Sequence, residues 1–187
     1  MELKTATARA KAKLCSQRTI IEGCLVRNNL VEPDNSYGRE KYGTVIAFPI
    51  TDDETFNGVK RSMKAAFERK REKLTENGVE PNFEEDVILP IREDSNIEDF
   101  YFLRATTTQK PTIVDTKKKP LNLTAEPVWG ARGKISVLFK CAKIDNKIRI
   151  FGTLQNVQLI SDKNYLEDSY YFTPDEDFDE ITLEDSE

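Results

Sequence analysis

Hydrophobic and polar residues alternate over a long stretch of the chain, from Arg132 to Ile160. Alternation with a period of two predicts β-strands. Asp145-Asn146, near the middle of the stretch, tolerates the positive φ that a two-residue type I′ turn requires. We therefore predict one long hairpin with residues paired outward from this turn. The expected apolar pairs are Cys141 with Ile150, Phe139 with Gly152, and Val137 with Leu154.

The other face of this predicted hairpin carries positive charge around an aromatic ring. Lys140 is expected opposite Phe151, and Ala142 opposite Arg149, because side chains alternate between the two faces of a strand. Lys134 and Arg132 follow further along the same face. A sheet face of this kind is poorly suited to burial and well suited to a polyanion with bases that can stack.

Other strands are predicted where β-branched and aromatic residues cluster. Arg18–Arg27 is apolar on both faces and is expected inside the sheet. A loop follows over Asn28–Lys41, and Tyr37, Arg39 and Lys41 within it are expected to be exposed and able to reach a ligand. The remaining strands are predicted at Tyr42–Ile50, Phe100–Thr107 and, briefly, Lys110–Asp115.

One long helix is predicted over Thr51–Gly78. Thr51 and Glu54 fit a capping box, apolar residues recur at helical spacing, and Asn77-Gly78 supplies a stop signal. The many cations on its other surface are typical of a solvated face, although those at Lys70–Lys73 could extend a basic track.

Two aromatic residues outside the hairpin have basic neighbours. Phe102 shares one face of its predicted strand with Arg104, and Trp129 lies close to Arg132 in the sequence. Each ring could fill the core or stack on a base. The adjacent cations favour stacking for Trp129.

Charge divides the chain into parts of opposite sign. From Glu167 onward there are ten carboxylates and no Lys or Arg, so a net charge of −5 for the whole chain leaves residues 1–166 with +5. We therefore predict a basic N-terminal arm over residues 1–17, a binding domain over 18–166 and an acidic tail over 167–187. This division is typical of an anion-binding domain with an interaction tail.

The residues that are missing exclude several kinds of chemistry. The sequence has no histidine, which removes Ser-His and Cys-His nucleophiles and most zinc sites. Its three cysteines form no CxxC pair, and no glycine-rich phosphate loop is present. We expect no cofactor and no metal. The apolar runs are too short to span a bilayer and no signal peptide is visible, so a cytoplasmic location is expected.

The segments KYGTVIAFPI, FYFLRATTTQKPTIVD and GARGKISVLFKCAKIDNKIRIFGTLQNVQLI, in this order, resemble the OB-fold single-stranded DNA-binding proteins of tailed bacteriophages. The resemblance spans Arg18 to Ile160. It implies a mainly β fold with one long helix, built as a five-stranded Greek-key barrel with extensions and an acidic disordered tail. It also implies a role in phage DNA replication and recombination within the host cell cytoplasm.

The predicted function is therefore non-enzymatic, sequence-independent binding of single-stranded DNA. The tail is expected to recruit phage or host replication and recombination proteins, a homo-oligomer is compatible with this function, and no membrane is involved. The expected DNA-contacting residues are Arg104, Arg132, Lys134, Lys140 and Arg149 for phosphates, and Phe102, Trp129 and Phe151 for bases. The expected partner-binding residues of the tail are Phe178, Asp179, Glu180, Ile181, Leu183, Glu184 and Asp185.

Two other functions fit parts of the sequence. The acidic tail could make the protein an adaptor or a DNA mimic, although the positive body opposes this reading. Alternatively, Glu84, Glu85 and Asp86 could bind a metal in a nuclease. That chemistry needs carboxylates brought together from separate strands, and a contiguous trio in a loop is weak evidence for it.

Overall fold

The computed structural model describes residues 14–36, 38–76, 78–94 and 97–166, and its longest feature is the predicted hairpin. Strand β7 (Ala131–Ile144) pairs with β8 (Lys147–Ser161) across Asp145 and Asn146, whose φ angles are 50° and 60°. Cys141 lies opposite Ile150 and Lys140 opposite Phe151, as predicted. The register shifts only beyond Val137, where a bulge interrupts the ladder. Local turn chemistry therefore determines this register.

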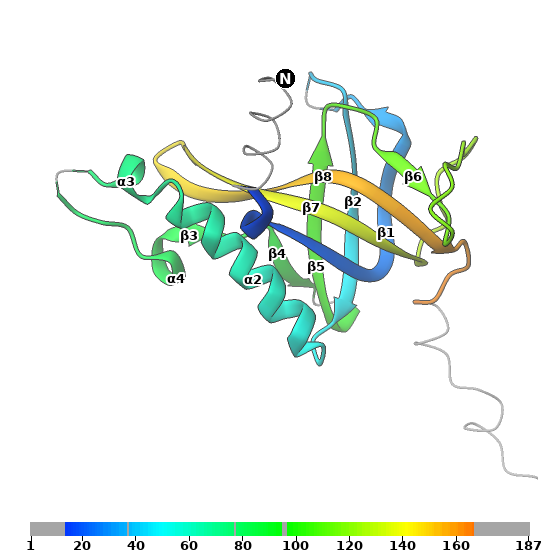
Figure 1. Ribbon diagram of the computed structural model, residues 1–187, viewed down its shortest axis with the longest axis horizontal. Coiled ribbons are helices and arrows are strands. Elements are labelled where there is room, and N and C mark those ends of the chain that lie inside the picture. The colour runs from blue at the N-terminus through cyan, green and yellow to red at the C-terminus, as the bar shows by residue number, and fades with distance from the viewer. Residues whose placement is uncertain (1–13, 37, 77, 95–96, 167–187) are drawn as a thin grey trace, which may run out of the picture.

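The strands close into the expected barrel. Strand β1 (Arg18–Asp34) pairs with both β2 (Lys41–Pro49) and β7, and β2 pairs with β5 (Ile97–Thr107). Ala105 and Thr106 of β5 then pair in parallel with Gly152 and Thr153 of β8, which completes the ring (Figure 1). The order β1-β2-β5-β8-β7 is that of an OB fold, so the predicted fold class is confirmed.

Short strands extend the sheet outside this ring. β3 (Val87–Ile88) and β6 (Thr112–Val114) pair in parallel with β8, and β4 (Ile91–Asp94) pairs with β5. The short strand expected within Lys110–Asp115 is therefore confirmed. The segment from Glu80 to Asp94, which is rich in acidic residues, supplies β3 and β4.

The core joins the inner face of the barrel to one helix. Helix α2 (Asp53–Glu68) lies beside β1 and β7 (Figure 1). It buries Val59, Met63 and Phe67 in the same apolar cluster as Ile21 and Phe139. The exposed cations of α2 face away from this cluster. None of the described helices combines the length and hydrophobicity needed to cross a bilayer.

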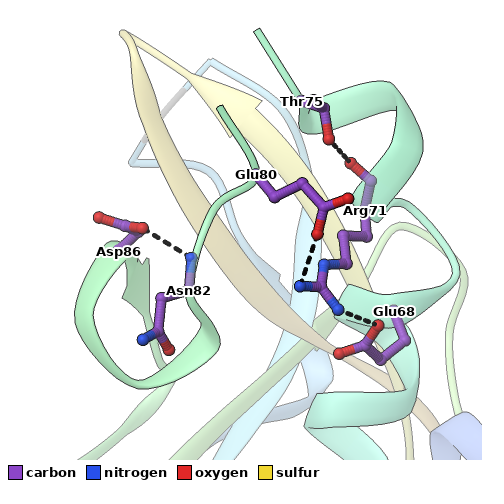
Figure 2. Close-up of polar contacts among 6 residues, drawn as sticks. All are labelled: Glu68, Arg71, Thr75, Glu80, Asn82 and Asp86. Atoms are coloured by element: carbon purple, nitrogen blue, oxygen red, sulfur yellow. Dashed lines mark hydrogen bonds and ion pairs between the residues drawn. The ribbon is translucent and has the colours of Figure 1, made fainter. Parts of the chain in front are cut away.

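The predicted helix boundaries were wrong at both ends. The side chain of Asp52, and not Thr51, caps α2 by accepting a hydrogen bond from the backbone N–H of Thr55 at 3.0 Å. The chain breaks after Glu68 and forms a separate turn, α3 (Arg71–Leu74), whose last residues are fixed by the Thr75 hydroxyl donating to the Arg71 carbonyl (Figure 2). Tertiary contacts thus override the helical pattern after Glu68.

Strand β1 is much longer than predicted, because a distant side chain replaces part of a strand partner. The carboxylate of Glu126 accepts hydrogen bonds from the backbone N–H groups of Leu30, Val31 and Glu32 at 2.7–2.9 Å. These donors would otherwise be left without a protein acceptor. The polar stretch from Asn28 onward is therefore held extended, although its composition is typical of a loop.

The barrel leaves no room for a side chain at Gly23. A Cβ atom there would lie 2.1 Å from the carbonyl oxygen of Ala47 on the neighbouring strand β2. Glycine is required here by the close approach of two strands, and not by its φ angle.

We expect Gly23→Ala to lower the free energy of unfolding by about 1–3 kcal/mol, since strands β1 and β2 must move apart. Gly58→Ala is the matched control, because a Cβ at Gly58 in α2 meets nothing within 4 Å. That change should stabilise the protein by about 0.5–1 kcal/mol through helix propensity. Urea unfolding followed by circular dichroism measures both. Equal effects of the two substitutions would contradict the packing argument.

Candidate nucleic-acid interface

A basic groove crosses the outer surface of β2, β5 and β8. It consists of three connected hollows, the largest about 700 Å³, and Lys41 and Thr106 line all three. We define the basic groove by its cations and its exposed ring. These residues are Arg27, Lys41, Arg92, Arg104, Lys140, Arg149 and Phe151.

The cations of the basic groove form no ion pair in the described part of the chain, where every ion pair involves other residues. One carboxylate, Asp34, lies among the described lining residues. Hydrogen bonds from Ser36 hold the pKa of Asp34 below its usual range, and the charges of Arg104 and Arg27 add to this effect. The groove therefore carries a net positive charge that the fold itself does not neutralise.

Phe151 is presented at the seam where β5 meets β8. The next residue, Gly152, lies against β5, and a Cβ there would come within 2.8 Å of the Arg104 carbonyl oxygen. This close approach brings Phe151, 38% exposed, into the same hollow as Arg104 and Arg149. The Nε of Arg149 is buried and has no hydrogen-bond partner among the described residues. The seam therefore combines an accessible ring with an unused donor.

The structure does not support a stacking role for Phe102. Its side chain is only 3% exposed and packs with Val45, Ala47 and Leu166 in a small second cluster on the outer face of the sheet. A base needs an open ring face, which Phe102 lacks. Phe102 instead forms part of the groove floor, beside Arg104. The sequence pattern placed it on the correct face but could not show that an apolar cluster buries it there.

Arg132 and Lys134 lie outside the basic groove. Both are paired with Glu22 on β1, with Arg132 Nη2 2.7 Å from Oε1 and Lys134 Nζ 2.8 Å from Oε2. Trp129 is 44% exposed but does not line the groove either. The predicted site residues are therefore split: the groove contains Arg104, Lys140, Arg149 and Phe151, whereas Trp129, Arg132 and Lys134 lie elsewhere.

Sequence reasoning gave no groove role to Arg27 or Arg92, and it expected Lys41 to reach a ligand from a loop, although Lys41 is the first residue of β2. Arg27 follows a register shift between β1 and β2, and such a bulge lets it line the groove while Val26 packs on the outer cluster. Arg92 lies on β4, within a segment rich in acidic residues. A basic residue directly after the apolar stretch that ends at Ile91 was the available signal for Arg92.

The acidic trio Glu84–Asp86 lies in the short helix α4 (Phe83–Asp86), not in a loop. Glu84 pairs with Lys60 at 2.9 Å, and Asp86 accepts a hydrogen bond from the backbone N–H of Asn82 at 2.7 Å (Figure 2). No group of three His, Cys, Asp or Glu side chains in the described ranges is placed to hold a metal ion. Two of the three carboxylates thus have structural contacts.

A closed OB-type barrel with a positively charged groove and an exposed ring on its sheet defines an oligonucleotide-binding class of protein. Sequence comparison makes this specific. The family model described as "Enterobacter phage Enc34, ssDNA-binding protein" matches residues 19–187, so the chain belongs to this family of single-stranded DNA-binding proteins. No curated protein sequence matches the chain.

Solved structures share the fold at low sequence identity. The single-stranded DNA-binding protein of bacteriophage Enc34, in complex with single-stranded DNA, is 14% identical, with a TM-score of 0.61 over 80% of this chain and 89% of that one. Gp2.5, a single-stranded DNA-binding protein encoded by bacteriophage T7, is 13% identical, with a TM-score of 0.61 over 83% of this chain and 98% of that one. At these identities the likeness shows the fold alone.

The ion pairs of Glu22 give a testable pH effect. Hydrogen bonds from Lys134 and Arg132 lower the pKa of the Glu22 carboxyl group below its ordinary value of 4.5. We expect Lys134→Ala to raise this pKa toward 4.5, as measured by NMR titration of the side-chain carboxyl carbon. Because the folded-state pKa is lowered, the stabilisation from these pairs is present above the unfolded pKa and is lost as pH falls through the folded value. An unchanged pKa in the variant would contradict the pairing.

Proposed function

We propose that the protein binds single-stranded DNA in the basic groove without sequence preference and acts in phage DNA replication and recombination. Family membership supports the ligand class. The observation that carries the proposal is the groove itself, where cations without acidic partners surround the exposed ring of Phe151. A polyanion that also offers stackable bases matches both features.

In the proposed mechanism, cations bind the phosphates and an aromatic ring binds a base. Arg27, Lys41, Arg104 and Lys140 neutralise phosphates along the groove, and the positive charge of Arg149 adds to theirs beside Phe151. Phe151 stacks on a base, a contact that tolerates any sequence because every base has a π-face. A duplex hides its base faces, so the ring favours single strands.

The remaining assignments follow from the sequence and the family. We propose that residues 1–17 act as a basic arm, residues 18–166 as the DNA-binding barrel and residues 167–187 as a partner-recruiting tail. The tail residues from Phe178 to Asp185 expected to contact partners lie outside the described residues. The proposed role is non-enzymatic, without a cofactor, in the cytoplasm of the host cell.

Fluorescence anisotropy tests this function directly, with labelled single-stranded and duplex oligonucleotides of the same length titrated at several salt concentrations. The proposal requires tighter binding to the single strand and an affinity that falls with salt. Equal affinity for both, or no binding at low salt, would refute it. Incubation of the labelled strand with magnesium or manganese tests the non-enzymatic assignment, and cleavage would overturn it.

Substitutions of Phe151 and Trp129 should affect the affinity for single-stranded DNA differently, because only Phe151 lines the groove. We expect Phe151→Ala to weaken single-strand binding by about 1–3 kcal/mol, the contribution of one stacked base. Trp129→Ala serves as the control and should leave the affinity unchanged, although Trp129 is as exposed as Phe151. Anisotropy titrations at one salt concentration compare the two variants. If only Trp129→Ala weakened single-strand binding, DNA would bind at the surface around Trp129 and not in the basic groove.

The salt dependence of binding tests the cations. For single strands the slope of log K against log salt is about −0.7 per phosphate contact, so Lys41→Ala with Arg104→Ala should make the slope less steep by about 1.4. The control replaces two exposed cations outside the groove, Lys117 and Lys119, with alanine and should keep the wild-type slope. If both double variants change the slope equally, the positive charge acts only through the net charge of the protein.

A further inference from the structure

A second set of cations lies next to the Lys140 end of the basic groove. We define the α2 patch as Arg18, Arg69 and Lys70, which come from the start of β1 and from the residues that follow α2. All three side chains are exposed. The groove proper does not include them, because none lines its hollows.

Sheet register connects Arg18 to the groove. Arg18 is paired with Leu138 of β7, and Lys140 lies two residues further along the same strand. Residues two apart on a strand share a face, so Arg18 and Lys140 are diagonal neighbours on the outer surface. Lys140 itself lines the groove together with Lys41 and Thr106. The backbone of Arg18 also contacts α2, where its carbonyl accepts a hydrogen bond from Ser62 at 3.4 Å.

A buried glutamine holds Arg69 at the same place. Gln17, in the short 3-10 helix η1 (Cys15–Gln17) that lies beside α2 and β7 (Figure 1), is 4% exposed. With its amide oriented to satisfy both neighbours, its nitrogen donates to the carbonyl of Phe139 at 3.3 Å and its oxygen accepts from Arg69 Nη1 at 3.1 Å. One side chain therefore links Arg69 to the residue that precedes Lys140.

The charge of Lys70 also acts on β7. Burial raises the pKa of the Cys141 thiol, and the positive charge of Lys70 partly opposes this rise. This influence indicates that Lys70 lies near Cys141, the residue that follows Lys140 on β7. Arg69 and Lys70 thus both lie close to the β7 segment from Phe139 to Cys141.

Nearby acids leave the α2 patch positive. Figure 2 shows Arg71 between Glu68 and Glu80, and the separations are 3.4 Å and 2.7 Å. Both carboxylates are thus paired with Arg71 and not with the cations of the α2 patch. Among the described residues Arg18, Arg69 and Lys70 form no ion pair.

We propose that a single strand leaving the basic groove at Lys140 continues over the α2 patch, so that one protein molecule occupies more nucleotides than the groove alone accommodates. This inference rests on the proposed function, since it extends the path of the same ligand. Only phosphates are contacted here, because the patch has cations and no exposed ring. The extension therefore adds affinity and salt dependence without adding stacking.

Oligonucleotides of two lengths distinguish binding in the basic groove alone from binding that extends over the α2 patch. We compare thymidine oligonucleotides of about 8 and about 24 nucleotides, the first within the range that a single OB fold binds. The variant Arg69→Ala with Lys70→Ala should bind the long strand about 3- to 10-fold more weakly at low salt, with a slope less steep by about 1.4. Its affinity for the short strand should equal that of the wild type.

Two variants control this experiment. Lys117→Ala with Lys119→Ala removes the same charge elsewhere and should bind both lengths as the wild type does. Lys70→Ala alone leaves the hydrogen bond between Gln17 and Arg69 intact, and it should show a smaller loss limited to the long strand. This single variant keeps the test valid if the double variant unfolds, which thermal unfolding detects.

The outcomes are distinguishable. Wild-type affinity of Lys70→Ala and of the folded double variant for the long strand overturns the extension while the groove proposal stands. An equal loss at both lengths also overturns it, because the patch would then belong to the groove. If the wild-type protein binds neither strand, the proposed function itself fails and the extension fails with it.

Discussion

The parallel pairing of β5 with β8 is the constraint on which the rest of the structure depends. Only two residue pairs form it, Ala105 with Gly152 and Thr106 with Thr153, yet they close the barrel. Gly152 permits this contact, because a Cβ there would meet the carbonyl oxygen of Arg104 at 2.8 Å. Closure removes two sheet edges and at the same time brings Phe151 beside Arg104. Folding and site assembly therefore depend on the same contact.

Acidic side chains decide which cations are available to a ligand. Glu22 pairs with Arg132 and Lys134, and so holds two cations of the β1 and β7 surface in internal contacts. Arg104 and Lys140 have no such partner among the described residues. An exposed ion pair contributes little to stability. A cation that must leave such a pair to contact a phosphate nevertheless loses part of the binding free energy that the new contact provides. The pairing pattern thus directs a polyanion to the groove.

Helix α2 connects this surface to the core. Its apolar side packs under β1 and β7, while the residues after its end bring Arg69 and Lys70 next to β7. The separate turn α3 turns Arg71 toward Glu68 and Glu80. The break after Glu68, which shortens the predicted helix, therefore also determines which cations stay free of carboxylates.

The sequence by itself determined the β7–β8 hairpin, its register near the turn and the face shared by Lys140 and Phe151, because turn chemistry and alternation are local. It also determined the OB class and the burial of the apolar pairs. Only the tertiary structure decided that an outer cluster buries Phe102, that Glu126 extends β1, and that Glu22 pairs with Arg132 and Lys134. Each of these depends on residues far apart in the chain, and no periodicity in a single segment records such contacts.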